Sequence, residues 1–132
     1  MTEKKPRKGY RKCQQCGRNR AERFFTGPRG RICETCRKRN KREANHDARV
    51  QRTYGLGPGE YRRLLEAQGG VCAICGEART YRLDVDHDHA SGLVRGLLCR
   101  RCNRDLLPAS RNRPAVLHQA AAYLEDPPAL RA

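Results

Sequence analysis

The sequence predicts a small α+β protein that is held together by metal sites and not by a large apolar core. Leu, Ile, Val and Phe together number 21 of the 132 residues, and the formal net charge is +15. Such a composition is typical of disordered chains. The eight cysteines, however, all lie in Cys-x-x-Cys pairs, and bound metal can fold a chain whose apolar core is too small. One segment between two of these pairs also alternates in hydropathy as a β-strand does.

The cysteine pairs form two sets, each with the spacing of a four-cysteine zinc site. The first set is Cys13, Cys16, Cys33 and Cys36, and the second is Cys72, Cys75, Cys99 and Cys102. A Cys-x-x-Cys turn places two thiolates on one side of a tight knuckle, and two such pairs complete the tetrahedron that Zn²⁺ accepts. A secreted disulfide scaffold is the alternative, but the first residues lack the apolar stretch of a signal peptide. We therefore expect two structural zinc ions and a reducing, cytoplasmic location.

Composition divides the chain into five expected segments. They are a basic disordered tail (1–12), an N-terminal zinc-ribbon-like module (13–36), a basic helical linker (37–54), a core (55–108), and a C-terminal helix and tail (109–132). Phe24 and Phe25 are the expected small apolar core of the first zinc module. The first module thus precedes, and is separate from, the segment in which we expect the main fold.

Three helices are predicted from helix breakers and apolar spacing. Residues 34–54 contain neither Gly nor Pro and predict one continuous helix. A short amphipathic helix is predicted over 58–68, and a C-terminal helix over 114–125. His46 and His118 lie on the first and last of these helices, and both are expected to be plain surface residues. The expected packing residues are Tyr61, Leu64 and Leu65 on the second helix, and Leu117, Ala121 and Leu124 on the third.

Basic charge is concentrated in the first half of the chain. Residues 1–66 carry a net charge of +13, whereas residues 67–132 carry +2. Excess charge can simply keep a chain soluble, but the commonest acidic partner of such a surface is a nucleic-acid backbone. The helix over 34–54 has almost no apolar face, so it is either a solvated connector or a rod lying along phosphates. The second alternative is favoured by its basic residues Arg37, Lys38, Arg39, Lys41, Arg42, Arg49 and Arg52.

The most informative segment lies between the last two cysteine pairs. Leu83 and Val85 alternate with aspartates, as in a half-buried strand. A turn at 90–92 and a second strand over 93–98 complete a hairpin, and residues 100–107 continue as a helix that we expect to stop at Pro108. The predicted order is therefore strand, turn, strand, helix, with a zinc site joining the hairpin to the start of the helix.

Asp86, His87, Asp88 and His89 are four consecutive residues of metal-ligating types within this hairpin. Hydrolysis of a phosphodiester needs a hard cation on oxygen ligands and a base that titrates near neutral pH. Asp86 and Asn103 can supply the oxygens, and His87 or His89 can supply the base. Ideal alternation places Asp86 and His87 on opposite faces, so the site requires a bend there or a phosphate between the two. A solvated polar turn and a histidine ligand to zinc are the alternatives.

The motif Val-Asp-His-Asp-His over 85–89, followed by Gly-Leu-Val-Arg-Gly-Leu-Leu-Cys-Arg-Arg-Cys-Asn over 92–103, closely resembles the phage recombination endonuclease VII family. This family belongs to the HNH, or ββα-metal (His-Me finger), nucleases, and the resemblance covers roughly 54–107. It implies a ββα-metal nuclease core with a structural zinc on the second cysteine set. It also implies a catalytic Mg²⁺ (or Mn²⁺) held by Asp86 and Asn103, with His87 as the base and His89 as an auxiliary facing the phosphate.

The function implied by this resemblance is that of an HNH-type, metal-dependent DNA endonuclease. Water activated by His87 would attack the phosphate in line and leave a 5′-phosphate and a 3′-hydroxyl, with Arg95 as a candidate phosphate contact. Branched or junction DNA, an intertwined homodimer, and phage recombination or packaging proteins are the implied partners. No apolar run approaches the roughly 18 residues of a membrane span, so no membrane is expected. The alternative function is a non-catalytic, zinc-dependent nucleic-acid-binding or regulatory protein.

Overall fold

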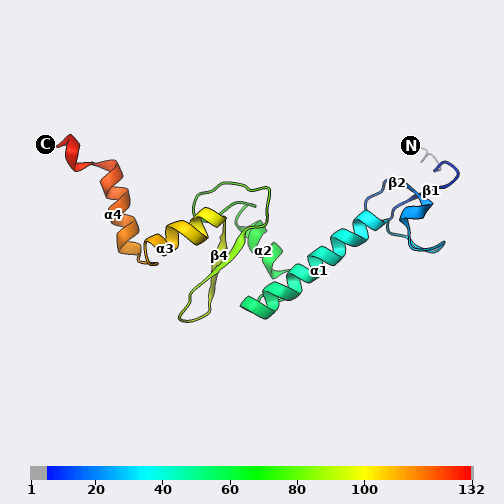
Figure 1. Ribbon diagram of the computed structural model, residues 1–132, viewed down its shortest axis with the longest axis horizontal. Coiled ribbons are helices and arrows are strands. Elements are labelled where there is room, and N and C mark those ends of the chain that lie inside the picture. The colour runs from blue at the N-terminus through cyan, green and yellow to red at the C-terminus, as the bar shows by residue number, and fades with distance from the viewer. Residues whose placement is uncertain (1–5, 132) are drawn as a thin grey trace. The chain divides into compact units, whose positions relative to one another are not determined.

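The structure is a computed structural model that describes residues 6–131. The chain is a small α+β protein that divides into two compact units between Arg49 and Val50, inside one long helix. In chain order (Figure 1), the elements are β1 (Tyr10–Lys12), β2 (Asn19–Ala21), η1 (Glu22–Phe24), α1 (Glu34–Tyr54), α2 (Glu60–Ala67), β3 (Asp84–His87), β4 (Val94–Leu98), η2 (Cys102–Leu106), α3 (Leu107–Ala109), α4 (Pro114–Glu125) and η3 (Pro128–Leu130).

The first unit is built around its four cysteines. Phe25 is buried against them, as predicted, and Ile32 packs on the same cluster. The prediction for Phe24 was wrong, since this ring is 39% exposed. Phe24 is the last residue of the 3-10 helix η1, whereas Phe25 follows it in extended conformation and forms an isolated β-bridge with Cys33, so the two rings point in different directions. Phe24 therefore faces outward, where the guanidinium of Arg23 lies 4.9 Å from its ring centroid.

The predicted disordered tail differs from the structure in its last residues. Tyr10–Lys12 forms β1, which pairs antiparallel with β2, while residues 1–5 of the predicted tail lie outside the described residues. Arg11 explains the order, because its guanidinium donates to the carbonyls of Pro28 (2.7 Å) and Gly27 (2.9 Å) and lies over the Phe25 ring. Arg11, which the sequence placed in a solvated tail, therefore stabilises the first zinc module.

Helix α1 has the bounds predicted from its lack of Gly and Pro, Glu34–Tyr54. Most of its side chains are exposed, as its composition requires. The prediction for His46 was wrong, because this residue is only 7% exposed. Its position explains the burial, since Val50, one turn further along the same face, is also buried. Most residues of the helix are charged or polar. A buried stripe of only two residues, His46 and Val50, is too short to be recognised in such a sequence.

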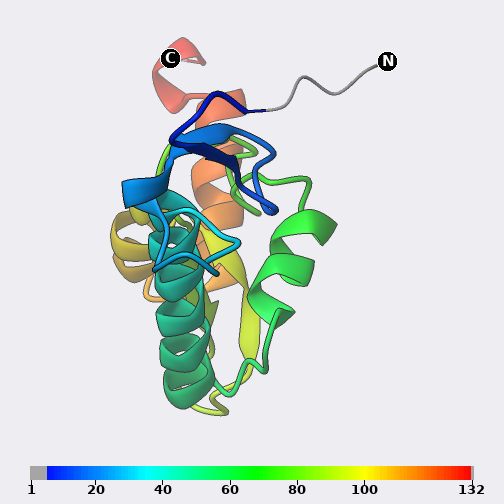
Figure 2. The ribbon, with the colours of Figure 1, turned by 90° about the vertical axis from the view of Figure 1, so that its right-hand side faces the viewer.

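The second unit packs α2 against the β3–β4 hairpin (Figure 2). Tyr61 is buried, with Leu64 and Leu65 packed on the core, as predicted, and the Tyr61 hydroxyl donates to the carbonyl of Leu83 at 2.8 Å. Gln68 then pairs with β4 as a strand would. Its amide nitrogen donates to the Leu97 carbonyl (2.9 Å) and its amide oxygen accepts from the Leu97 N–H (2.8 Å). These bonds tie the helix end to the hairpin.

The helix after the hairpin continues past its predicted stop. Residues 100–109 are helical, but η2 is a π-helix and Pro108 lies inside α3, in its first turn. Proline within a continuous helix removes one backbone hydrogen bond, and its ring crowds the preceding turn. The wide π turn before it lets the chain continue, and the helix ends instead at Ser110, before two residues in the left-handed region, Arg111 and Asn112 (φ 53° and 54°).

Helix α4 spans Pro114–Glu125, as predicted, but its apolar side chains pack less than expected. Leu117 is half-buried and His118 is exposed, in agreement with the prediction. Ala121 is exposed and Leu124 is 75% exposed, so their predicted packing was wrong. Among the described residues, no helix is both long enough and apolar enough to cross a membrane.

Candidate functional site

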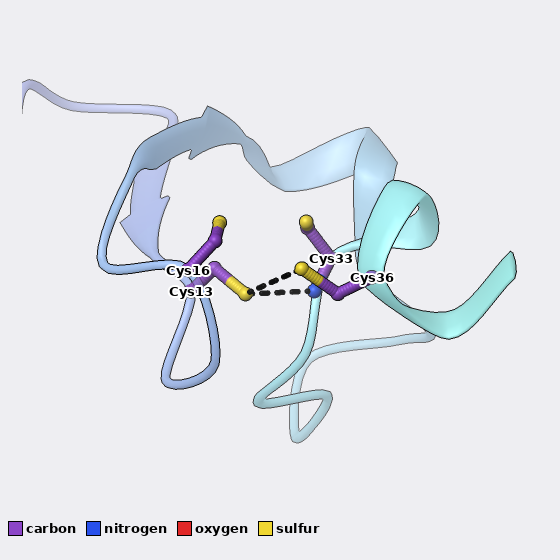
Figure 3. Close-up of side chains that lie close together, drawn as sticks. All are labelled: Cys13, Cys16, Cys33 and Cys36. Carbon is purple, nitrogen blue, oxygen red and sulfur yellow. Dashed lines mark hydrogen bonds between the residues drawn. The ribbon is translucent and has the colours of Figure 1, made fainter. Parts of the chain in front are cut away.

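The four cysteines of the first unit converge on one point, as Figure 3 shows. Their sulfur atoms all lie within 4.8 Å of one another, and the Sγ atoms of Cys13 and Cys36 are 3.9 Å apart. A tetrahedral zinc ion with Zn–S bonds of about 2.3 Å separates its sulfurs by about 3.8 Å, whereas a disulfide bond measures about 2.05 Å. The cluster therefore has the dimensions of a metal site and not of a disulfide pair.

The second cluster is built on the same plan. Its sulfurs also lie within 4.8 Å of one another, with Cys75 and Cys99 at 3.9 Å. In each cluster the first cysteine pair is a knuckle closed by a glycine, Gly17 or Gly76, whose N–H donates to the carbonyl of the first cysteine at 2.9 Å. Both glycines have φ of +69°, which L side chains rarely adopt. The second cysteine pair of each cluster begins or immediately precedes a helix.

The thiol pKa values follow the same pattern in both clusters. Backbone N–H donors, of which that of Cys33 is the strongest, lower the pKa of Cys13 to about 6. Burial raises the pKa of Cys72, but the N–H groups of Cys99 and Cys75 outweigh it and bring the pKa down to about 6. Burial and neighbouring thiols raise the pKa of Cys36 to about 12 and raise that of Cys102 as well. Four thiolates can coexist here only around a cation, so the donor chemistry fits zinc.

The β3–β4 hairpin carries the second group of candidate residues, and its register breaks among them. Asp86 pairs with Gly96 but His87 pairs with Val94, so Arg95 is an extra residue on β4. A bulge of this kind bends the strand and re-aims its side chains. For Asp86 and His87 to serve one site, the sequence required a bend at this position or a phosphate between the two, and the register shift lies at this position, with its extra residue on the facing strand β4.

Arg95 holds the carboxylate of Asp86 from both oxygens. Its Nε donates to Oδ2 at 2.8 Å and its Nη2 donates to Oδ1 at 2.9 Å, while Nη2 also donates to Oδ1 of Asn112 at 3.1 Å. The Asp86 carboxylate in turn raises the pKa of Arg95. Arg95 was predicted to contact a phosphate, but in this structure its partner is the carboxylate predicted to bind metal.

The ion pair lies in the wall of an open cavity of about 300 Å³. Asp86, Arg95 and Asn112 form its polar side, and Ile74, Leu107 and Leu117 belong to its apolar side. The cavity is formed by the second cysteine knuckle, β3, β4, the first residue of α3, the turn before α4 and α4 itself. A small anion or a hydrated ion can therefore approach the Asp86–Arg95 pair from solvent.

His87 and His89 lie together at the end of the hairpin. Their ring centroids are 4.7 Å apart, and the Tyr54 ring lies 5.3 Å from that of His87. Within residues 6–131, no hydrogen bond engages the ring nitrogens of either histidine, so both can still exchange a proton or bind a substrate oxygen. The contact with Tyr54 was not predicted, because nothing in a charged helix marks its last residue as a neighbour of the hairpin.

Asn103 and Asp88 are placed differently from the other candidates. Asn103 lies in η2 directly after Cys102, and its backbone N–H donates to the Cys99 carbonyl at 3.0 Å. Its side-chain amide contacts no described residue by a hydrogen bond and does not line the Asp86 cavity, so its pairing with Asp86 stays a prediction. Asp88 instead organises the hairpin turn, where it accepts from the Ser91 hydroxyl at 2.7 Å, and this bond chiefly lowers its pKa.

Arginines accompany the thiolates of both clusters. The Nη2 of Arg79 lies 4.0 Å from the sulfurs of both Cys75 and Cys99, and Arg79 also pairs with Glu77. Arg39 lies 3.9 Å from the sulfur of Cys36. The thiolate of Cys99 raises the pKa of Arg79. If zinc is bound, these cations would partly neutralise the charge that four thiolates bring to it.

Comparison with known proteins places the chain in a family. Residues 47–126 match the family of recombination endonuclease VII, and the chain belongs to that family. The gene 59 protein of Mycobacterium phage D29 is 39% identical over 109 residues, which are 81% of this chain and 66% of that protein. The gene 59 protein of Mycobacterium phage L5 is 44% identical over 87 residues, or 64% and 53% of the two chains. The chain therefore spans between about half and two thirds of these relatives.

A solved structure gives a weaker likeness. The ββα-Me type II restriction endonuclease Hpy99I is 26% identical, with a TM-score of 0.37, over 89% of this chain and 65% of that one. A TM-score this low does not establish a common fold. The family assignment therefore stands on the sequence match, which includes the hairpin, the second cysteine cluster and α4.

Proposed function

We propose that the protein is a metal-dependent DNA endonuclease that hydrolyses phosphodiester bonds to 5′-phosphate and 3′-hydroxyl products. The observation that carries this proposal is the bulge between Asp86 and His87, in a chain of the endonuclease VII family. The bulge separates a buried carboxylate from a histidine whose ring is open to a substrate. These are the two types of group that metal-assisted hydrolysis requires.

Each candidate residue has a separate task in this proposal. Asp86 and Asn103 offer the oxygen ligands that a divalent cation such as Mg²⁺ prefers, and such a cation supplies charge stabilisation at the departing oxygen. His87 accepts the proton of the attacking water, for which its ring nitrogens are available. His89, 4.7 Å from His87 between ring centroids, contacts the phosphate. The second zinc cluster holds the hairpin and the following helix in place, and neither cluster takes part in the chemistry.

The basic residues of α1 supply affinity for the DNA backbone. The predicted contacts are Arg37, Lys38, Arg39, Lys41, Arg42, Arg49 and Arg52. All of these side chains are exposed on α1. Contacts of this kind do not depend on base sequence, and they weaken steeply as salt rises. Junction DNA, a homodimer and phage recombination or packaging partners, acting in the host cytoplasm, complete the proposal and rest on the family alone.

A second candidate function is a zinc-dependent DNA-binding protein without catalysis. The Asp86–Arg95 ion pair favours it, because an arginine already neutralises the carboxylate that the enzyme would use for metal. The two functions differ in one measurable property, which is the cleavage of DNA by protein that contains its full complement of zinc.

The test is cleavage of plasmid and four-way-junction DNA with Mg²⁺ or Mn²⁺ by the wild type, His87→Ala and His118→Ala. Loss of a general base typically slows a reaction by about 10² to 10⁴-fold, so we expect that loss for His87→Ala only. The exposed His118 on α4 is the matched control. Equal cutting by the wild type and His87→Ala would remove His87 from the mechanism. No cutting by the zinc-replete wild type would favour the binding protein.

A further inference from the structure

Asp86, a proposed metal ligand, forms an ion pair with Arg95, whereas binding of a metal requires its carboxylate to be free. Both oxygens of Asp86 accept hydrogen bonds from one guanidinium. A divalent cation on the same carboxylate would lie close to the positive charge of Arg95, and like charges on one carboxylate repel. The pair and the metal therefore compete for Asp86, although each oxygen has a second lone pair.

Arg95 is the partner that can move. Its side chain is 39% exposed, whereas that of Asp86 is 10% exposed. Arg95 is also the extra residue of the bulge, outside the regular β3–β4 register. Asn112 offers its guanidinium a second, uncharged acceptor on the cavity wall. Asp86, by contrast, lies within β3 and is held in register opposite Gly96.

A DNA phosphate can replace the carboxylate as the partner of Arg95. Guanidinium groups bind carboxylates and phosphates with the same bidentate geometry, so the exchange conserves the hydrogen bonds of Arg95. The cavity of about 300 Å³ that borders the pair is open to solvent and leaves room for a phosphate group. After the exchange, the guanidinium of Arg95 would pair with the substrate phosphate, and the carboxylate of Asp86 would be free.

We propose that Arg95 couples DNA binding to metal binding by exchanging its partner. Without DNA it neutralises Asp86 and keeps the affinity for divalent cations low. A phosphate that enters the cavity takes over the guanidinium and releases Asp86 to the cation. Because such coupling is reciprocal, the bound cation also raises the affinity for DNA by the same factor. This inference rests on the proposed function, in which Asp86 is a metal ligand, and it makes Arg95 a positioning residue for the metal.

The test is a calorimetric titration of the full chain with Mn²⁺, with and without duplex DNA, in the His87→Ala background that prevents cleavage. DNA alone is titrated in parallel and subtracted. We expect DNA to lower the Mn²⁺ dissociation constant at Asp86 by at least about 10-fold, the scale of typical coupling between sites. With Arg95→Ala added, Mn²⁺ should bind at least about 10-fold more tightly without DNA, and DNA should then change its affinity by less than about threefold.

Arg104→Ala is the matched control for charge. The Nε of Arg104 lies 2.9 Å from Oδ2 of Asp84. Asp84 is two residues before Asp86 on the same strand. Removal of Arg104 deletes the same charge nearby without touching Asp86, so the effect of DNA on Mn²⁺ binding should persist. Arg95→Gln serves as a second variant that keeps much of the side chain, and its zinc content shows whether the fold is intact. It should shift Mn²⁺ binding in the same direction as Arg95→Ala.

The outcomes separate this inference from the proposed function. If Asp86→Asn abolishes Mn²⁺ binding but Arg95→Ala and Arg95→Gln leave it unchanged or weaken it, Arg95 does not compete with metal and the inference is wrong, while the metal site stands. Equal effects of Arg104→Ala and Arg95→Ala would also overturn it. If Asp86→Asn leaves Mn²⁺ binding unchanged with and without DNA, the metal site itself is wrong, and the inference fails with it.

Discussion

The two four-cysteine clusters share a plan and differ in what lies between their cysteine pairs. Each joins a knuckle closed by a left-handed glycine to a pair at the start of a helix. In each, the first cysteine has a lowered pKa and the last a raised one. The first cluster encloses 16 residues with a single acidic side chain and no histidine, whereas the second encloses 23 residues that include the bulged hairpin.

We therefore expect the first cluster to be a scaffold only and the second to position the proposed site. The cysteines hold two chain segments together in both units, so a zinc site by itself says nothing about catalysis. Only the second unit uses the enclosed segment to present Asp86, His87 and His89. The first unit is therefore an internal control for the second, and equivalent substitutions in the two units should have different effects on cleavage.

The largest expected difference follows from removing one ligand of each cluster. Structural zinc in small domains contributes about 10 to 16 kcal/mol, so either Cys33→Ser or Cys99→Ser should lose one zinc of two. Cys99→Ser should also lose all cleavage, because the hairpin is no longer tied to its helix. Cys33→Ser should keep cleavage at low salt. Metal analysis and plasmid cleavage measure both, and complete loss of cleavage in Cys33→Ser would show that the units do not act separately.

A smaller effect is expected from the charges of α1. Replacing Arg37, Lys38, Lys41 and Arg42 with Gln should weaken DNA binding and flatten its salt dependence by about 0.9 in log–log slope for each phosphate that the protein no longer neutralises. The cleavage rate at saturating DNA should stay within about twofold, since none of these residues belongs to the candidate hairpin site. Fluorescence anisotropy at several salt concentrations measures the slope. An unchanged slope would identify α1 as a solvated connector.

Removal of the Arg79 side chain should speed the release of zinc more than it destabilises the fold. Partners beyond the ligands commonly change metal affinity by about 10 to 100-fold, so Arg79→Ala should release zinc to a chromophoric chelator about 10-fold faster or more. Arg39→Ala is the comparison in the first cluster, and it should have the smaller effect, because Arg39 lies near one sulfur and Arg79 near two. Identical release from the two variants and the wild type would mean that the arginines are only neighbours.

The smallest effect concerns the hairpin turn. The Ser91 hydroxyl and the amides of Ala90 and Ser91 lower the pKa of Asp88. The contribution of the ionised carboxylate is therefore complete above the ordinary pKa of about 3.9 and is lost only as the pH falls below it. Protection of the Ser91 amide from hydrogen exchange should be constant between pH 5 and 8 after correction for the intrinsic rate, and lower in Asp88→Ala. A step near pH 6.5 would instead implicate a histidine.

Local patterns predicted the parts of the fold that depend on local sequence. The absence of Gly and Pro defined α1, and the alternation around Leu83 and Val85 defined the hairpin strands. Strand geometry also indicated that a site shared by Asp86 and His87 needs a bend or a phosphate between them, and the strand register shifts at this position. Contacts between distant segments carry no such local signal.

Three outcomes show what the sequence could not supply. His46 is buried on a helix whose other residues are mostly charged, so its face was not recognisable. Leu124 is exposed, although its spacing on α4 is that of a packing residue, because periodicity does not show whether a partner exists. The contact of Arg95 with both Asp86 and Asn112 depends on the bulge and on a left-handed turn, and neither has a sequence motif here.

We propose that the hairpin of the second unit holds a metal-dependent nuclease site. The most direct measurement is the single-turnover rate of plasmid cleavage by Asp86→Asn and Asp84→Asn over a range of Mg²⁺ concentrations. Asp84 is on the same strand and pairs with Arg104, so it is the matched control. Asp86→Asn should slow cleavage by about 100-fold or more and Asp84→Asn by less than about threefold. Equal rates for the two variants would contradict a metal-dependent nuclease site at Asp86.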